Sequence, residues 1–257
     1  MIKHTPKEGI PRSGWSALKE KFILVALSIM AIGQWADTKA LLVETYVDIV
    51  SNFTHHYEYE VLSTINIGSN LEYFKQNFGV PQLIKPSKYE EDVRFAYFLN
   101  DKYILTLILN KTRISAYTIT ALVEDFVPYG LLDKSPQTER QKISDKVTEI
   151  ADYTLDYNNI EFVLVREQLD KSKLFINKYF GAIAYTDDIK LPSFVLKEIS
   201  DALNFEDEES EAIAAKVKNL ISETYNNYYG VGEVDLSLIT DSILTKFEYS
   251  LYAKKPA

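Results

Sequence analysis

Few side chains in this sequence could act as a general base or bind a metal. The chain contains three histidines, His4, His55 and His56, and no cysteine. His55 and His56 are adjacent and are followed by Glu58 and Glu60, a combination of imidazoles and carboxylates that could serve either purpose. Because neighbouring residues of an extended segment point to opposite sides, the two imidazoles are poorly placed to chelate one ion. We therefore interpret His55 and His56 as an exposed junction between a stalk and the folded body, and we predict no metal site.

Sequence motifs of catalysis and cofactor binding are missing. The chain has no Gly-x-Gly-x-x-Gly, P-loop, His-Glu-x-x-His, Gly-x-Ser-x-Gly or calcium-loop pattern. Without cysteine it has no thiolate nucleophile and no Cys-ligated zinc. Carboxylates at 90–92 and 187–188 fall in predicted loops, where solvation explains them. We predict no catalytic residue and no cofactor, and therefore a protein that is not an enzyme. The alternative is a hydrolase whose base is His55, His56 or a perturbed carboxylate.

Tyrosine is unusually frequent, with eighteen residues in 257. Tyr225, Tyr228 and Tyr229 surround Asn226 and Asn227 and precede a glycine. Aromatic residues of this kind are enriched at binding surfaces, so these three tyrosines are a possible interaction surface. A helix end packed against the core accounts for the same residues without a partner.

The charge of the chain is unevenly distributed. The formal net charge is −9, while residues 1–21 contain five Lys/Arg and two acids, which leaves −12 on the remainder. A body this acidic does not suit nucleic-acid binding, which depends on Lys and Arg neutralising phosphates. Apolar residues make up 46% of the chain, enough for a packed core. We predict a folded protein with no nucleic-acid partner.

One uncharged segment, Phe22 to Ala36, predicts contact with a membrane. As a helix its fifteen residues extend about 22 Å, and Trp15 and Trp35 would lie about 30 Å apart, at the two membrane interfaces. The positive-inside rule places the basic tail, residues 1–21, in the cytoplasm and the acidic body outside. We therefore predict a single transmembrane helix over 22–36, acting as a signal-anchor in a bacterial inner membrane.

Two alternatives to a transmembrane helix remain for the segment 22–36. Ala31-Ile32-Gly33 would suit signal-peptide cleavage, and 22–36 could instead be a core helix of a soluble cytoplasmic interaction protein.

Residues 37–56 continue as a predicted helical stalk with a narrow apolar seam. That seam could pair two copies of the chain into a homo-oligomer, or pack on the body of the same chain.

The segment 57–127 predicts an α+β domain. Its pattern indicates a strand, a short helix over 71–78 and three further strands over 93–99, 103–109 and 112–122. Asn70 is a suitable N-cap for the helix, and Gly79 is a suitable stop. The three strands are separated by Asn100-Asp101 and Asn110-Lys111, both suited to tight turns. They predict an antiparallel meander with the helix on one face.

This segment resembles a known family. Gly68, Asn70, Phe74, Phe78, Gly79 and Pro81 match the motif of the SmpA/OmlA envelope lipoprotein domain. The resemblance covers about residues 62–122 and implies the fold shared with the β-lactamase inhibitor protein. Members of that family are anchored through a lipidated cysteine, which this chain lacks, so a scaffolding or binding domain is what the resemblance implies here.

The region 138–257 predicts a mainly helical α/β part beyond a boundary at 128–137, which contains Gly130 and Pro136. The expected elements are one strand over 161–166, helices over 138–153, 172–180, 193–203 and 207–225, and a stretch over 236–252 that fits either helix or strand. The sequence thus predicts an α+β protein with an N-terminal membrane helix.

From these features we expect a membrane-anchored, non-catalytic protein-binding or scaffolding protein of the bacterial envelope. A membrane-tethered defence or stress-response component with a sensing soluble domain is an alternative from another class. The soluble interaction protein, in which 22–36 is a core helix, is the third.

Overall fold

A computed structural model of the chain describes residues 39, 55–128, 139–167, 176–205 and 210–253. The chain divides into two compact units, Met1–Tyr57 and Glu58–Ala257. Of the first unit only Lys39, which is helical and exposed, and residues 55–57 are described. The predicted tail, membrane segment 22–36 and nearly all of the stalk lie outside the described residues. Within the described part, no helix has both the length and the apolar character needed to cross a membrane.

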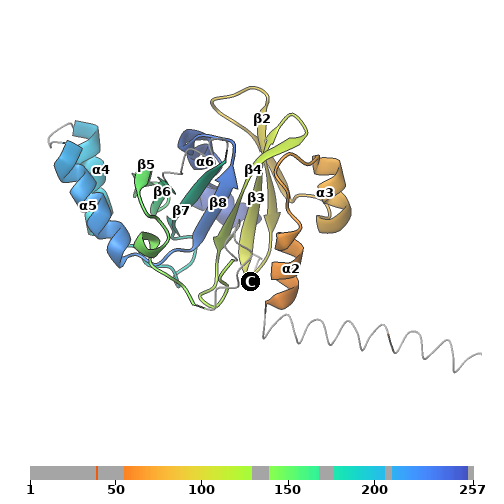
Figure 1. Ribbon diagram of the computed structural model, residues 1–257, viewed down its shortest axis with the longest axis horizontal. Coiled ribbons are helices and arrows are strands. Elements are labelled where there is room, and N and C mark those ends of the chain that lie inside the picture. Colours follow the sequence, from red (N-terminus) through yellow and green to blue (C-terminus); the bar gives the residue numbers. More distant parts are fainter. Residues whose placement is uncertain (1–38, 40–54, 129–138, 168–175, 206–209, 254–257) are drawn as a thin grey trace, which may run out of the picture. The chain divides into compact units, whose positions relative to one another are not determined.

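The second unit is built on one antiparallel sheet of eight strands (Figure 1), ordered β1-β2-β3-β4-β8-β7-β6-β5. The strands are β1 Leu83–Pro86, β2 Val93–Leu99, β3 Tyr103–Asn110, β4 Arg113–Ala121, β5 Ile150–Asp156, β6 Phe162–Glu167, β7 Asn177–Ile183 and β8 Tyr228–Gly232. The first four form one meander and the next three form a second. The fold is therefore α+β, as predicted, and both halves of the body share one sheet.

The last strand in the sequence, β8, joins the two meanders. It pairs with β4 on one side and with β7 on the other. A Cβ at Gly232 would lie 2.1 Å from the Ala116 Cβ on β4, and a Cβ at Gly181 on β7 would lie 2.2 Å from the Val163 carbonyl oxygen. Glycine at these positions lets β8 pack closely on β4 and lets β7 pack closely on β6.

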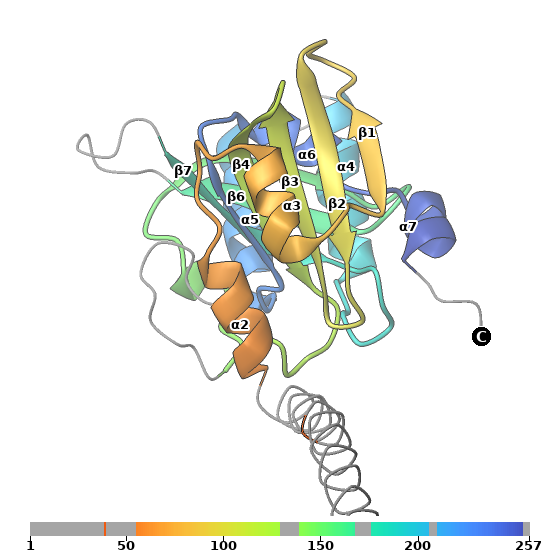
Figure 2. The ribbon, with the colours of Figure 1, turned by 90° about the vertical axis from the view of Figure 1, so that its right-hand side faces the viewer.

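Helices cover both faces of the sheet. On one face α2 (His56–Ser63) and α3 (Leu71–Phe78) lie over the first meander, while α4 (Ser193–Phe205) and α5 (Ser210–Glu223) lie over the second. The opposite face carries α6 (Leu236–Asp241) and one apolar cluster that extends across both meanders. Figure 2 shows the last helix, α7 (Lys246–Tyr252), beside the edge strand β1, where Glu248 forms an ion pair with Lys85 at 3.2 Å.

The first half of the body agrees closely with the sequence pattern. The helix α3 and the strand β2 have the predicted bounds, β3 extends one residue beyond its predicted end, and β4 is one residue shorter than predicted at each end. The Asn70 side chain accepts a hydrogen bond from the Glu72 N–H at 2.9 Å, and Gly79 ends the helix with a φ of 77°. The turn between β3 and β4 is centred one residue later than predicted, because Lys111 takes up the positive φ of 57°.

The expected strand that starts at Tyr57 is wrong, since these residues form α2. Tyr57 and Tyr59 alternate with acidic residues, which is the pattern of a half-buried strand. The segment nevertheless forms a helix, because residues of its helical face pack on the body of the protein. Leu62 is buried in the apolar cluster under α2 and α3, and the Tyr59 hydroxyl accepts a hydrogen bond from the Val127 N–H at 2.9 Å.

The C-terminal part contains more strands than the one predicted, because 138–257 supplies four of the eight strands. The predicted helix over 138–153 is a short 3-10 turn, η1 (Ile143–Asp145), followed by β5; the predicted helix over 172–180 overlaps β7. Gly181, interpreted as a helix stop, lies inside β7, where its N–H donates to the Asn226 side chain at 2.6 Å. The strand over 161–166 and the helices over 193–203 and 207–225 are confirmed in type, and 236–252 forms α6 and α7.

We predict that Gly232→Ala destabilises the protein by about 3 kcal/mol, the upper range for overpacking a core, because the new methyl group meets Ala116. Gly230→Ala is the matched control, since a Cβ there would lie no closer than 3.1 Å to another atom, the Tyr179 Cβ; we expect a loss of about 1 kcal/mol. Urea denaturation at pH 7 measures both. Equal losses would show that close packing of β4 and β8 is not the cause.

Candidate functional site

An open cleft of about 980 Å³ hollows the described surface. Four segments that are distant in the sequence line it: the chain after β4, the residue Arg140, the loop after β7, and the end of α5. Its lining residues are Val123, Glu124, Asp125, Arg140, Asp187, Asp188, Ile189, Lys190, Pro192, Glu223, Thr224 and Tyr225. We call it the acidic cleft.

Backbone pairing brings these segments together. The chain beside Arg140 is tied to the end of α5 by two hydrogen bonds, from the Asn226 N–H to the Gln141 carbonyl at 2.9 Å and from the Ile143 N–H to the Thr224 carbonyl at 3.0 Å. An isolated bridge between Lys142 and Tyr225 lies between them. Arg140 and Tyr225 are thereby fixed on the same wall.

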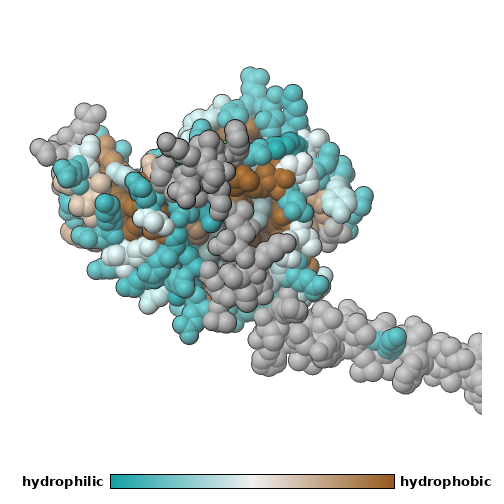
Figure 3. All heavy atoms as spheres, in the orientation of Figure 1, coloured by the Kyte–Doolittle hydropathy of each residue, from teal (hydrophilic) through white to brown (hydrophobic). Residues whose placement is uncertain are grey.

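Negative charge dominates the lining. Five carboxylates, those of Glu124, Asp125, Asp187, Asp188 and Glu223, line the cleft against two cations, and all five residues are exposed. Carboxylates gathered along a low-dielectric wall raise the local concentration of cations. Hydrophilic residues also cover much of the described surface in Figure 3, where apolar residues gather in the middle of the view, between α4/α5 and α2/α3.

Arg140 places a cation inside this acidic lining. One Nη donates to the Val123 carbonyl at 3.1 Å, while its Nε is buried and has no acceptor among the described residues. Burial lowers the pKa of the guanidinium, and the carboxylates of Glu124, Asp125 and Asp188 offset part of that decrease. The group stays charged at neutral pH. The cleft therefore presents carboxylates at its surface around one half-buried cation.

The three tyrosines that we predicted as an interaction surface lie in different environments. Tyr225 precedes β8, while Tyr228 and Tyr229 are neighbours within β8 and so face opposite sides of the sheet. Tyr225 is 56% exposed and lines the acidic cleft, whereas Tyr228 and Tyr229 are buried at 2% and 1%. Tyr229 packs edge to face on Phe180, and Tyr228 belongs to the apolar cluster on the opposite face of the sheet. Only Tyr225 contributes to an exposed surface.

The two asparagines between these tyrosines hold the sheet together. Both are buried, and the Asn227 amide donates to the carbonyls of Ala121 and Ile183 at 3.0 Å each. The Asn227 side-chain oxygen accepts the Ile183 N–H at 2.8 Å. Asn227 thus joins the ends of β4 and β7 at the point where β8 begins between them.

Neither histidine of the predicted junction is among the lining residues of the acidic cleft. His55 is buried, at 7% exposure, which differs from the exposed junction we predicted, and His56 begins α2. Nearby, Glu58 forms an ion pair with Lys102 at 2.6 Å. Across the described ranges, no three His, Asp or Glu side chains form a group able to hold a metal ion.

Most of the cleft was not predicted from the sequence. Asp187 and Asp188 were recognisable as an acidic loop, but nothing in the sequence relates them to Arg140 or Glu223, because the cleft exists only once β7, β8 and α5 are assembled. Arg140 itself lies in a segment whose sequence pattern predicts a helix.

Comparison with known proteins gives no match, since no protein-family model, no curated protein and no solved structure is significantly similar to this chain. The likeness of residues 62–122 to the SmpA/OmlA domain therefore stays a prediction.

We predict that Arg140→Met lowers the free energy of unfolding by about 1–3 kcal/mol at pH 7, because the Val123 carbonyl loses its donor and the carboxylates lose a neighbouring cation. The loss should be smaller at low pH, where carboxylates lose their charge. Lys190→Met, which removes an exposed cation of the same cleft, should change stability by less than about 0.5 kcal/mol. Urea denaturation at both pH values tests this, and a pH-independent loss would attribute the effect of Arg140 to packing alone.

Proposed function

We propose that the protein is a non-catalytic binding protein, held at a membrane by residues 22–36, whose body binds a basic, extended segment of another protein in the acidic cleft. The observation that carries the binding half of the proposal is the cleft itself. It combines five exposed carboxylates with an exposed tyrosine.

The chemistry of the cleft supports a peptide as ligand. Its volume of about 980 Å³ is at the upper end of the range for a small-molecule site and leaves room for several side chains. Lys or Arg side chains of a partner would pair with the carboxylates, and Tyr225 offers a ring for apolar or cation–π contact.

The lining also supports binding without catalysis. It contains no histidine, and its threonine, Thr224, donates its hydroxyl to the Leu220 carbonyl at 2.7 Å. A nucleophile paired with a base, which acyl or phosphoryl transfer requires, is therefore not assembled among the described lining residues.

The membrane half of the proposal rests on the sequence. Phe22 to Ala36 carries no charge and follows a basic tail, while the rest of the chain is acidic. A tether of this kind would place the acidic cleft on the outer side of the membrane.

We expect the full-length protein to bind a labelled decalysine peptide in a salt-sensitive manner, measured by fluorescence anisotropy at low and at moderate ionic strength. Asp188→Asn combined with Glu223→Gln should weaken binding about 3- to 10-fold, since each exposed pair contributes little alone. Glu90→Gln combined with Glu91→Gln is the control, because it changes the net charge equally at exposed residues outside the cleft. If both pairs of substitutions weaken binding equally, the peptide follows the net charge and the cleft is not its site.

Membrane fractionation tests the tether separately. We expect the full-length chain to resist a carbonate wash and a chain starting at Asp37 to be soluble and folded. A full-length chain that washes off, together with a truncated chain that aggregates, would instead identify 22–36 as a core helix.

A further inference from the structure

The last helix, α7, carries large apolar side chains on its outward side. Phe247 and Leu251 are four residues apart, so they share one side of the helix. They are 74% and 58% exposed, and Tyr252, the last residue of the helix, is 47% exposed. A single exposed apolar residue is common, but several together on one short helix indicate a surface that binds something apolar.

The other side of α7 attaches the helix to the body. The Tyr249 ring stacks on that of Tyr185, with the ring centroids 4.6 Å apart, and the Glu248 carboxylate forms its ion pair with Lys85 of β1. The Thr245 hydroxyl caps the helix by accepting the Glu248 N–H at 3.2 Å. These contacts use one side of the helix and leave its apolar residues facing outward.

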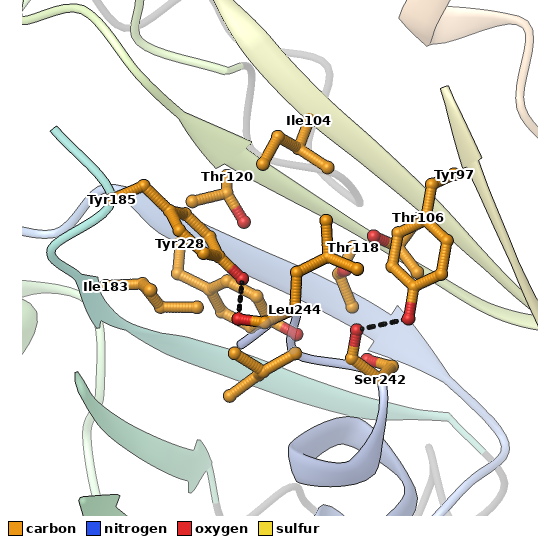
Figure 4. A pocket seen from close by; sticks show the side chains of 11 residues that line it. Tyr97, Ile104, Thr106, Thr118, Thr120, Ile183, Tyr185, Tyr228, Ser242 and Leu244 are labelled. Atoms are coloured by element: carbon orange, nitrogen blue, oxygen red, sulfur yellow. Dashed lines mark hydrogen bonds between the residues drawn. The ribbon is translucent and has the colours of Figure 1, made fainter. Parts of the chain in front are cut away.

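The segment that leads into α7 is fixed as well (Figure 4). The Tyr97 hydroxyl donates to the Ser242 carbonyl at 2.8 Å, and the Tyr185 hydroxyl donates to the Leu244 carbonyl at 3.0 Å. Tyr97 is fully buried on β2, so its bond connects this segment to the core of the sheet. The fold itself therefore sets the direction in which α7 presents its apolar side.

The charge around α7 is opposite to that of the body as a whole. Lys246 is exposed at the start of the helix, and Lys254 and Lys255 follow its end in the sequence. The one acid in residues 244–257 is Glu248, which is already in an ion pair. Three lysines and one acid give this segment a side-chain charge of +2, within a body that is strongly acidic. An anionic surface is attracted to this end of the body and repelled by acidic parts elsewhere.

We propose that the outward side of α7 lies on an anionic phospholipid membrane, with Phe247 and Leu251 inserted at the head-group boundary and the three lysines beside lipid phosphates. Aromatic and leucine side chains accompanied by lysines are the composition of helices that lie in a membrane interface. Each lysine at an anionic surface increases membrane affinity about 5-fold. Because α7 has only seven residues, the contact rests on the membrane half of the proposed function, in which the tether keeps the body at a high local concentration near the lipid.

A second copy of the chain fits this side of α7 less well than lipid does. A symmetric dimer brings the same patch of both copies together, so the lysines of one copy would face those of the other. Like charges placed together in an interface disfavour it. A lipid surface instead supplies phosphates for the lysines and acyl chains for the apolar residues.

A single fluorescent label tests the contact, because the chain has no cysteine of its own. Full-length Leu251→Cys, labelled with bimane, is reconstituted into vesicles of phosphatidylglycerol and phosphatidylcholine that contain a lipid with a nitroxide near its head group. We expect the nitroxide to quench this label, and we expect most of the quenching to be lost in vesicles of phosphatidylcholine alone. Tyr73→Cys is the matched control, since Tyr73 is 64% exposed on α3, over the opposite face of the sheet from α6. Its label should stay unquenched.

Further variants separate this contact from the tether. Phe247→Ser, and Lys246→Gln combined with Lys254→Gln and Lys255→Gln, should each remove most of the quenching at position 251 without changing resistance to a carbonate wash. A carbonate-resistant chain whose two labels are quenched alike would overturn the inference and leave the tether standing. A label at 251 whose emission shifts with protein concentration before lipid is added would assign this side of α7 to a second copy. A chain that washes off would overturn the tether and the contact that depends on it.

Discussion

The close approach of β4, β8 and β7 is the constraint on which the rest of the body depends. The strand β8 is five residues long and buried throughout, and it fits against β4 only because Gly232 leaves room for Ala116. Asn227 then satisfies the polar groups at the strand ends that meet there. With β8 in place, two meanders become one sheet, the apolar cluster under α6 becomes continuous, and the walls of the acidic cleft meet.

Local signals in the sequence predict the first meander well. The helix α3 has a cap, a stop and an apolar face within ten residues, and the hairpins that follow have turn residues between short apolar strands. The second meander lacks such signals, because its strands are determined by what they pack against. The segment 138–153 has the apolar spacing of a helix, yet Ile150 and Tyr153 contact the cluster under α4 and α5 as part of an edge strand. Gly181 is a plausible helix stop and instead serves as the close contact of β7 with β6.

The acidic cleft could be predicted only in fragments. Tyr225 was recognisable from its aromatic and polar neighbours, but Tyr228 and Tyr229 follow it with the same composition and lie inside the body. The difference arises because β8 starts three residues after Tyr225. No local sequence pattern predicts that start. Arg140 lines the cleft because the chain beside it pairs with residues more than eighty positions later. A contact at that separation cannot be predicted from a short stretch of sequence.

The strand order has a consequence for how the protein is made. The centre of the sheet is its last strand in the sequence, so a chain emerging from the ribosome forms β1 to β4 and β5 to β7 before the residues that join them exist. Until residues 228–232 are available, β4 and β7 each present an open edge, and edges of this kind recruit other strands. Contacts so distant in sequence also slow folding. Nascent chains cut short before β8 should therefore be the species that chaperones hold and proteases remove.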